Sequence, residues 1–398
     1  MDEKYLFAFQ KKLWIGVIGL SIGLGLIFLS LPVFLEDWSK EVIDFSERDK
    51  ELKNQIGQMI MIGFRDTEAS ADSYIAKAIR DLKVGGVILF DYDVPSKSFP
   101  RNIINPEQTK NLISDLKRYS SVPLLVAVDA EGGKVNRLKE EYGFISVPSA
   151  KELGEIDDVE NTRKVAEGLA KELKELGFNM NFAPVIDVDV NPENPVIGGL
   201  GRAFSADPLR VAAHARAFIL VHHQNNIITV VKHFPGHGSS TADSHLGLVD
   251  VTKSYKKEEL IPYQDLQKEG LLEAVMTAHI MNRNVDENFP ATLSPHFLKG
   301  VLRDQIGFGG VVISDDAQMG AITANYGFEE AVVRMVNAGC NMIIISNNSQ
   351  AEYDENLPYQ TVDIIYNAVK EGKIPIEKIT DSFNRIQRLK SNLVNAQN

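Results

Sequence analysis

Chemically active side chains gather in one short stretch, residues 230–247, which reads VVKHFPGHGSSTADSHLG. It continues an apolar, β-branched run at residues 227–231, the pattern of a buried strand. Two glycines, Gly236 and Gly238, allow the backbone to bend or to approach a ligand closely. The polar groups of the stretch are Lys232, His233, His237, Asp243 and His245. So many imidazole, amine and carboxylate groups after one strand indicate a functional loop rather than a turn whose polar residues only cap the backbone.

Carboxylates also follow other apolar runs. Asp315 and Asp316 end the run GGVVISDD, and Asp129 follows PLLVAV. Because strand side chains alternate, one of the two adjacent aspartates should point inward and the other away. An inward carboxylate at the end of a strand can act as a nucleophile or stabilise positive charge on a bound molecule. A helix N-cap is the alternative role, more so for Asp316 than for Asp315.

The elements that must position these groups alternate between strand and helix patterns. The apolar runs lie at residues 56–64, 85–90, 123–129, 178–189, 227–231, 274–281, 309–316 and 340–346. Helical patterns occupy residues 74–82 and 161–176, and helices start at Pro106 and Pro208. This alternation predicts an α/β fold of the (β/α)8 TIM-barrel type over residues 55–398, with catalytic groups at the carboxyl ends of the strands. A doubly wound sheet is the alternative, but its Gly-rich dinucleotide loop is missing from the sequence.

The N-terminal region predicts a membrane anchor. Residues 13–35 carry no charge, and a run of this length can cross a bilayer. Lys11 and Lys12 precede the run, so residues 1–12 are expected in the cytoplasm and the catalytic domain outside it. A cleaved signal peptide is the alternative, although the run is long for one and lacks an A-x-A site. Residues 36–54 are predicted to be a stem. The expected architecture is thus a barrel preceded by a single-pass transmembrane helix in the cell membrane.

Composition narrows the class of partner. The chain has 398 residues and a formal net charge of −12, which argues against nucleic acid as the main partner. Cys340 is the single cysteine, so no intramolecular disulfide can form.

The order KHFPGHG and then DSH resembles glycoside hydrolase family 3, in particular its β-N-acetylglucosaminidase branch. The resemblance implies a His–Asp acid/base dyad on a mobile loop, with His245 as general acid/base and Asp243 as its partner. The family's nucleophile follows a Ser at the end of the seventh strand, here the run at residues 309–316. In this sequence the corresponding residue is Asp315. The resemblance therefore implies retaining hydrolysis of a glycan with terminal N-acetylglucosamine, without a metal or cofactor. Fragments of cell-wall peptidoglycan are the expected substrate.

The same resemblance assigns the groups that hold the terminal sugar, which are Asp129, Arg137, Arg202, Lys232 and His233. A surface or supporting ion pair is the alternative role for the two arginines. Four positions depart from the family's usual motifs, and they leave the specificity open: Ala130 and Lys134 in DAEGGKV, Ala203 after the motif arginine, and Asn341 in AGCNM.

Two other functions remain as alternatives. In a metal-dependent barrel hydrolase, histidines such as His233, His237 and His279 would be ligands, although no HExxH or His-x-His motif is present. A membrane-tethered sugar-binding protein would need no acid/base and no nucleophile. Sensitivity to a chelator would identify the first, and sugar binding without turnover would identify the second.

Overall fold

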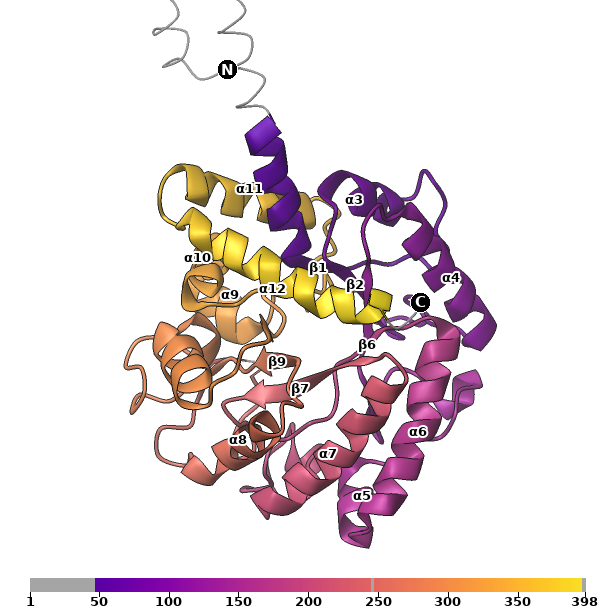
Figure 1. The fold of residues 1–398 in the computed structure, drawn as a ribbon, viewed down its shortest axis with the longest axis vertical. Helices are drawn as coiled ribbons and strands as arrows, with labels where there is room; N and C mark the ends of the chain where they lie inside the picture. The colour runs from indigo at the N-terminus through magenta and orange to yellow at the C-terminus, as the bar shows by residue number, and fades with distance from the viewer. Residues whose placement is uncertain (1–46, 245–246, 396–398) are drawn as a thin grey trace, which may run out of the picture. The chain divides into compact units, whose positions relative to one another are not determined.

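The structure is a computed structural model, and it describes residues 47–244 and 247–395 (Figure 1). The chain forms two compact units, Met1–Leu52 and Lys53–Asn398, and the fold described here is that of the second unit. The domain boundaries expected at residues 12, 35 and 54 stay predictions.

A parallel sheet lies at the centre of this unit. In the described part of the chain it has eight strands, in the spatial order β11-β9-β7-β6-β3-β2-β1-β12. The strands are β1 (Ile60–Gly63), β2 (Gly86–Leu89), β3 (Leu125–Val128), β6 (Met180–Asn181), β7 (Ile228–Phe234), β9 (Ala274–Thr277), β11 (Val311–Ile313) and β12 (Ile343–Ile345). Two small pairs accompany the sheet: β4 (Ala130–Gly132) with β5 (Val135–Asn136), and β8 (Val249–Asp250) with β10 (Ile280–Met281).

Helices surround the sheet (Figure 1). The α-helices are α3 (Tyr74–Leu82), α4 (Pro106–Tyr119), α5 (Ala150–Ile156), α6 (Val159–Leu176), α7 (Pro208–Gln224), α8 (Ile261–Lys268), α9 (Gly320–Tyr326), α10 (Phe328–Ala338), α11 (Leu357–Lys370) and α12 (Ile376–Asn395). Short 3-10 turns are η2 (Glu140–Tyr142), η3 (Gly198–Leu200), η4 (Lys257–Leu260) and η5 (Ala291–Leu293), and η6 (His296–Gln305) is a π-helix.

The helix starts expected from proline are confirmed, and their caps explain them. Pro106 opens α4 behind Asn105, whose side chain accepts a hydrogen bond from the Gln108 N–H. Pro208 opens α7 behind Asp207, which caps the Leu209 N–H in the same way.

The fourth predicted strand is much shorter than expected. Residues 178–189 form only the two-residue strand β6, although the apolar pattern suggested a long strand. Pro184 lies just beyond it, and proline removes a ladder donor. After Pro184 a single bridge joins Val185 to Lys232 of β7. The residues after β6 are therefore free to form the long loop that reaches the carboxyl ends of the strands.

The prediction of a closed barrel behind a transmembrane helix is wrong. The sheet is nearly closed: between its edge strands β11 and β12, one isolated bridge joins Ile313 to Met342. Side chains replace part of the ladder at this seam. The Asn341 Oδ1 accepts a hydrogen bond from the Val312 N–H (2.9 Å), and the Ser314 Oγ accepts one from the Ile344 N–H (3.2 Å).

The second correction concerns the transmembrane helix. Across residues 47–244 and 247–395, none of the helices has both the length and the apolar character required to cross a bilayer. Residues 13–35, on which the expectation rested, lie outside the described residues.

Candidate active site

A charged cradle lies at the carboxyl ends of neighbouring strands. We use this name for Asp129, Glu131, Arg202, Lys232 and His233. Asp129 follows β3, Glu131 belongs to β4, Arg202 follows η3, and Lys232 and His233 belong to β7. Because β3 and β7 flank β6 in the sheet, their ends bring these side chains to one part of the rim.

Two cations cross-link the carboxylates of the cradle. The Lys232 ammonium contacts Asp129 Oδ1 at 2.7 Å and Glu131 Oε1 at 2.6 Å. Arg202 forms a bidentate pair with Glu131, and both N···O distances are 2.8 Å. Such forked pairs fix direction as well as distance, so the cradle is held rigidly before any ligand arrives.

These contacts keep the two acids ionised. Burial by itself would raise the pKa of Asp129, but the charges of Lys232 and Arg137 outweigh it and lower the pKa to about 2. Burial likewise opposes ionisation of Glu131, and Arg202 and Lys232 lower its pKa in spite of it. At neutral pH both groups accept hydrogen bonds and have no proton to give.

His233 is a neutral imidazole with a fixed tautomer. Burial, together with the charges of Arg202 and Lys232, lowers its pKa well below the usual value. The Arg202 Nη2 lies 3.1 Å from His233 Nε2, and arginine can only donate. The proton must therefore sit on Nδ1, which donates to Asp187 Oδ2 at 2.7 Å.

Asp187 joins the cradle to the loop that follows β7. Besides His233 Nδ1, it accepts the His237 backbone N–H at 2.8 Å. The carboxylate is completely buried, and burial raises its pKa. Asp187 is therefore an anchor for two histidines rather than a group that meets the substrate.

The two aspartates after β11 have different surroundings. Asp316 accepts hydrogen bonds from the Ser346 N–H (3.1 Å) and hydroxyl (2.5 Å), and burial raises its pKa to about 6. Asp315 is half-buried, accepts the Asp316 N–H at 2.8 Å, and raises the pKa values of His233 and His237 by its charge. Asp316 thus binds the neighbouring strand end, while Asp315 acts electrostatically on His233 of the cradle and on His237.

The foot of the loop after β7, residues 235–240, is clamped from two sides. On one side Asn194 Nδ2 donates to the His237 carbonyl at 2.7 Å, and a Cβ placed on Gly238 would lie 1.7 Å from the Val188 carbonyl oxygen. On the other side Glu259 Oε2 accepts the Ser239 N–H at 3.2 Å, and Tyr255 donates its hydroxyl to Pro235 (2.9 Å). Gly238 is required here because no side chain fits this approach.

Beyond the foot, the loop is exposed at Thr241 and Ala242 and buried again at Ser244. The Ser244 Oγ shares a hydrogen bond of 3.2 Å with His237 Nε2. Burial lowers the pKa of His237, so this partner is also a neutral imidazole. Asp243 is half-buried next to this contact, and His245 lies outside the described residues.

Arg137 stands at the edge of the cradle. Its guanidinium lies 3.8 Å from Asp129 Oδ2 and 3.9 Å from the buried Asp91, which also pairs with Lys139 at 2.7 Å. The structure therefore places Arg137 between two carboxylates.

His279, a ligand in the metal-dependent alternative, is fully buried and hydrogen-bonded at both ring nitrogens. Its Nδ1 shares a bond of 2.8 Å with Thr292 Oγ1, and its Nε2 donates to the Asp316 carbonyl at 3.0 Å. It can bind a metal only if one of these bonds breaks.

The four departures from the family motifs lie in supporting positions. Ala130 is buried in β4, and Ala203 packs in an apolar cluster with Val185 and Ile197. Lys134 is exposed. Asn341 fills the seam of the sheet, where it also accepts from Arg303 at 2.8 Å.

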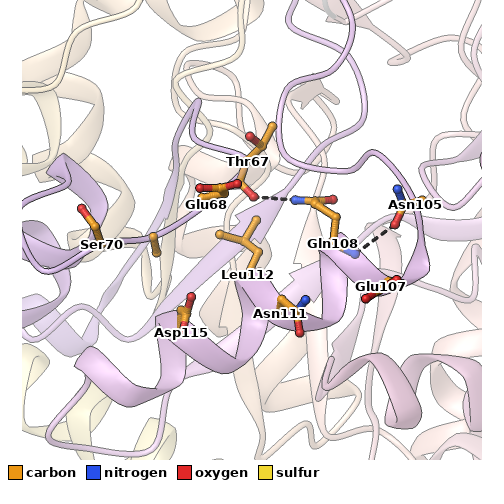
Figure 2. Close-up of a pocket in the computed structure, with 10 residues that line it drawn as sticks. Thr67, Glu68, Ser70, Asn105, Glu107, Gln108, Asn111, Leu112 and Asp115 are labelled. Carbon is orange, nitrogen blue, oxygen red and sulfur yellow. Dashed lines mark hydrogen bonds between the residues drawn. The ribbon is translucent and has the colours of Figure 1, made fainter.

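A polar hollow of about 400 Å³ lies away from the cradle (Figure 2). It is bounded by residues 67–70, which follow β1, and by the first part of α4. Gln108 spans it with a 2.6 Å bond to the Thr67 carbonyl (Figure 2). It includes none of the expected catalytic residues, so its size does not mark the active site.

Sequence reasoning missed three groups that complete the site: Glu131, Asp187 and Asp91. Glu131 and Asp187 both lie at the ends of predicted strands, and that position was the available signal. Neither residue type nor spacing says which carboxylate meets the sugar and which holds a cation, because that depends on partners from distant segments.

Comparisons with known proteins identify the family of the chain. Residues 51–389 match the model of the glycosyl hydrolase family 3 N terminal domain. A β-hexosaminidase of Idiomarina loihiensis is 34% identical over 296 residues, which cover 73% of this chain and 84% of that protein. A β-hexosaminidase of Nitrosomonas eutropha is 37% identical over 275 residues, covering 67% and 74% of the two chains.

Solved structures give the same result. A family 3 β-N-acetylglucosaminidase from Paenibacillus sp. str. FPU-7 superposes with a TM-score of 0.77 at 35% identity, over 86% of this chain and 62% of that one. This chain thus spans less than two thirds of the Paenibacillus protein. A β-N-acetylhexosaminidase from Beutenbergia cavernae superposes with a TM-score of 0.74 at 26% identity, over 85% and 98% of the two chains.

The chain belongs to glycosyl hydrolase family 3. The resemblance to the family's β-N-acetylglucosaminidase branch is confirmed, and the chain is an enzyme of the β-hexosaminidase type.

Proposed function

We propose that the enzyme is a retaining β-N-acetylhexosaminidase that removes terminal β-linked N-acetylglucosamine. The observation that carries this proposal is the charged cradle with Asp315 beside it. Ionised Asp129 offers hydrogen-bond acceptors to sugar hydroxyls, and Arg137, Arg202 and Lys232 offer donors. His233 supports Arg202 through the 3.1 Å contact of its Nε2 with Arg202 Nη2.

Asp315 is the proposed nucleophile. Its carboxylate forms a bond to the anomeric carbon as the bond to the leaving oxygen breaks, which gives a covalent glycosyl-enzyme. The contacts of Asp316 with Ser346 support this choice, because they commit that neighbouring carboxylate to the sheet.

His245 is the proposed general acid/base, with Asp243 as its partner. It donates a proton to the leaving oxygen in the first step and takes a proton from the attacking water in the second. Asp129 and Glu131 are ionised at neutral pH, because the pKa of Asp129 is about 2 and that of Glu131 is lowered, so neither has a proton to donate. An imidazole whose ordinary pKa is about 6.5 suits both steps near neutral pH.

The test is hydrolysis of an aryl β-N-acetylglucosaminide and of the matching aryl β-glucoside, each with and without a chelator. We expect chelator-resistant turnover of the N-acetylated substrate, and its loss in both Asp315→Asn and His245→Ala. Loss of activity with chelator would support the metal-dependent alternative. Sugar binding without turnover would support a binding protein.

We also propose peptidoglycan fragments with a terminal N-acetylglucosamine as the natural substrate class. The support is the sequence resemblance. Release of N-acetylglucosamine from a muropeptide, compared with release from a chitin oligosaccharide of equal length, measures this preference. A location of the catalytic unit outside the cytoplasmic membrane remains a prediction, and protease accessibility in intact cells tests it.

A further inference from the structure

A hairpin of residues 90–102 rises from the carboxyl end of β2. Its two arms are joined by backbone hydrogen bonds: the Asn102 N–H donates to the Phe90 carbonyl (2.9 Å), and the Arg101 N–H donates to the Asp91 carbonyl (2.7 Å). Nearer the tip, the Asp93 N–H donates to the Ser98 carbonyl at 2.8 Å. The segment therefore has an ordered backbone of its own.

Charged groups brace this hairpin against the strand ends next to it. Asp93 receives a forked pair from Arg65 at 3.0 Å for both bonds and also pairs with the buried Arg101. Asn348, after β12, accepts the Val94 N–H at 2.9 Å and donates to the Tyr92 carbonyl at 3.1 Å. Because these contacts come from the residues that follow β1 and β12, they hold the hairpin at the carboxyl ends of the strands.

The hairpin continues directly into the edge of the active site. Asp91 contacts Lys139, and Arg137 lies between Asp91 and Asp129 of the cradle. Higher up, the Phe99 ring stacks on Tyr142 of η2, with centroids 4.5 Å apart and planes 21° apart. We call this continuous surface, made of the hairpin with Arg137, Lys139 and Tyr142, the end wall.

The order of the strands says which end of the sugar faces the wall. β3 and β11 are four places apart in the eight-strand order, so Asp129 and Asp315 lie across the nearly closed sheet from each other. If Asp315 attacks the anomeric carbon, the opposite, non-reducing end of the same ring lies toward Asp129. The end wall then stands where the preceding sugar of a longer chain would have to lie.

We propose that the end wall determines exo specificity, because it blocks the space beyond the non-reducing end of the bound sugar. This inference rests on the proposed function, and it assigns the specificity to side chains outside the catalytic set. The ligand that the wall excludes is a second β-linked pyranose on the non-reducing side. Tyr142 and Phe99 contribute the removable part of the wall, whereas Lys139 is kept because it pairs with the buried Asp91 beside Arg137.

The experiment uses an aryl β-chitobioside, and the products are separated by chromatography. We expect the wild type to release N-acetylglucosamine first and the free aryl group only after a lag. The double variant Phe99→Ala/Tyr142→Ala should release intact chitobiose at least about tenfold faster than the wild type. Its rate on the aryl β-N-acetylglucosaminide should stay within about threefold of the wild-type rate.

A matched variant at two positions outside the end wall and the cradle, Tyr119→Ala/Leu209→Ala, should behave like the wild type. The proposal is overturned if the wild type itself releases chitobiose, or if the double variant turns over the monosaccharide substrate and still yields none. Failure of both proteins to cleave the monosaccharide substrate is a different result, because it removes the proposed function together with this inference.

Discussion

The cradle and the loop after β7 are built in opposite ways, although they share strand β7. Lys232 and Arg202 each bind two other members of the cradle, and Glu131 is bound by both cations. Thr241 and Ala242 of the loop are exposed, and Ser244 returns to the protein through a hydrogen bond to His237. One region is a buried network, and the other is an exposed segment with a fixed foot.

This difference separates two tasks of the enzyme. A sugar binds with the smallest loss of binding free energy when the charged groups are already in place, because these groups need no reorganisation. A group that first protonates an oxygen and later deprotonates a water meets two different atoms, so an adjustable segment suits it. Variants in the cradle should therefore affect stability and substrate binding together, while variants in the loop should affect turnover.

The largest effect is expected at Asp315. Asp315→Asn should lower kcat by about 10⁴-fold or more, because the neutral amide forms no glycosyl-enzyme. Steady-state kinetics on the aryl β-N-acetylglucosaminide measures this. The matched change Asp316→Asn should mainly lower the unfolding temperature, since it weakens the bonds to Ser346. Equal losses of kcat in the two variants would contradict the separate roles.

Breaking the cradle should cost stability. Arg202→Ala leaves the buried Glu131 with Lys232 as its remaining cation, and we expect a loss of about 3–5 kcal/mol in the free energy of unfolding. The KM for the aryl substrate should rise as well. Denaturant unfolding provides the measurement, and Arg163→Ala, at an exposed ion pair on α6, should leave both quantities unchanged.

The foot of the loop should make stability depend on pH. Burial raises the pKa of Glu259 from 4.5 to about 7. Its contribution to the free energy of unfolding is therefore fully present below its ordinary pKa and is lost as the pH rises through about 7. Between about pH 5 and pH 8 this group should remove about 3 kcal/mol of stability. Glu259→Gln should flatten that part of the profile of unfolding free energy against pH. An unchanged slope would show that Glu259 ionises normally.

A smaller effect is expected where the loop meets His237. Ser244→Ala removes the hydroxyl that bonds His237 Nε2, so kcat should fall by about tenfold while KM changes little. Ser244→Thr keeps a hydroxyl and should recover most of the rate. If the alanine variant raised KM instead, the loop would act in binding rather than in turnover.

The smallest effect is expected at a position where this sequence differs from the usual family motif. Lys134 is exposed, so Lys134→Arg, which restores the usual family residue, should change stability by less than about 0.5 kcal/mol. Kinetics and thermal unfolding would both detect a larger change, which would mean that this position contacts the substrate.

The strands and helix starts could be predicted because their signals are local. Each strand is a short apolar run, and Pro106 and Pro208 mark helix starts within a few residues. The short β6 and the sheet seam at Asn341 were not foreseen. β6 ends before Pro184, whose effect the long apolar pattern concealed, and the seam depends on hydrogen bonds between distant segments.

For the site, the sequence predicted which residues carry chemistry better than how they are paired. Asp129, Arg202, Lys232 and His233 do meet at one rim. Their partners Glu131 and Asp187 were visible only as polar ends of strands. Pairing was hidden because Arg202 and Glu131 are separated by 71 residues, and only the folded chain brings them within 2.8 Å.

The most direct test of the account is to trap the intermediate with a fluorinated N-acetylglucosaminyl fluoride, which slows its hydrolysis. Intact mass spectrometry followed by peptide mapping would locate the label. We predict one sugar per enzyme, attached to Asp315, and no label in Asp315→Asn. A label on Asp316 or Asp243, or turnover with inversion and no adduct, would contradict the proposed mechanism.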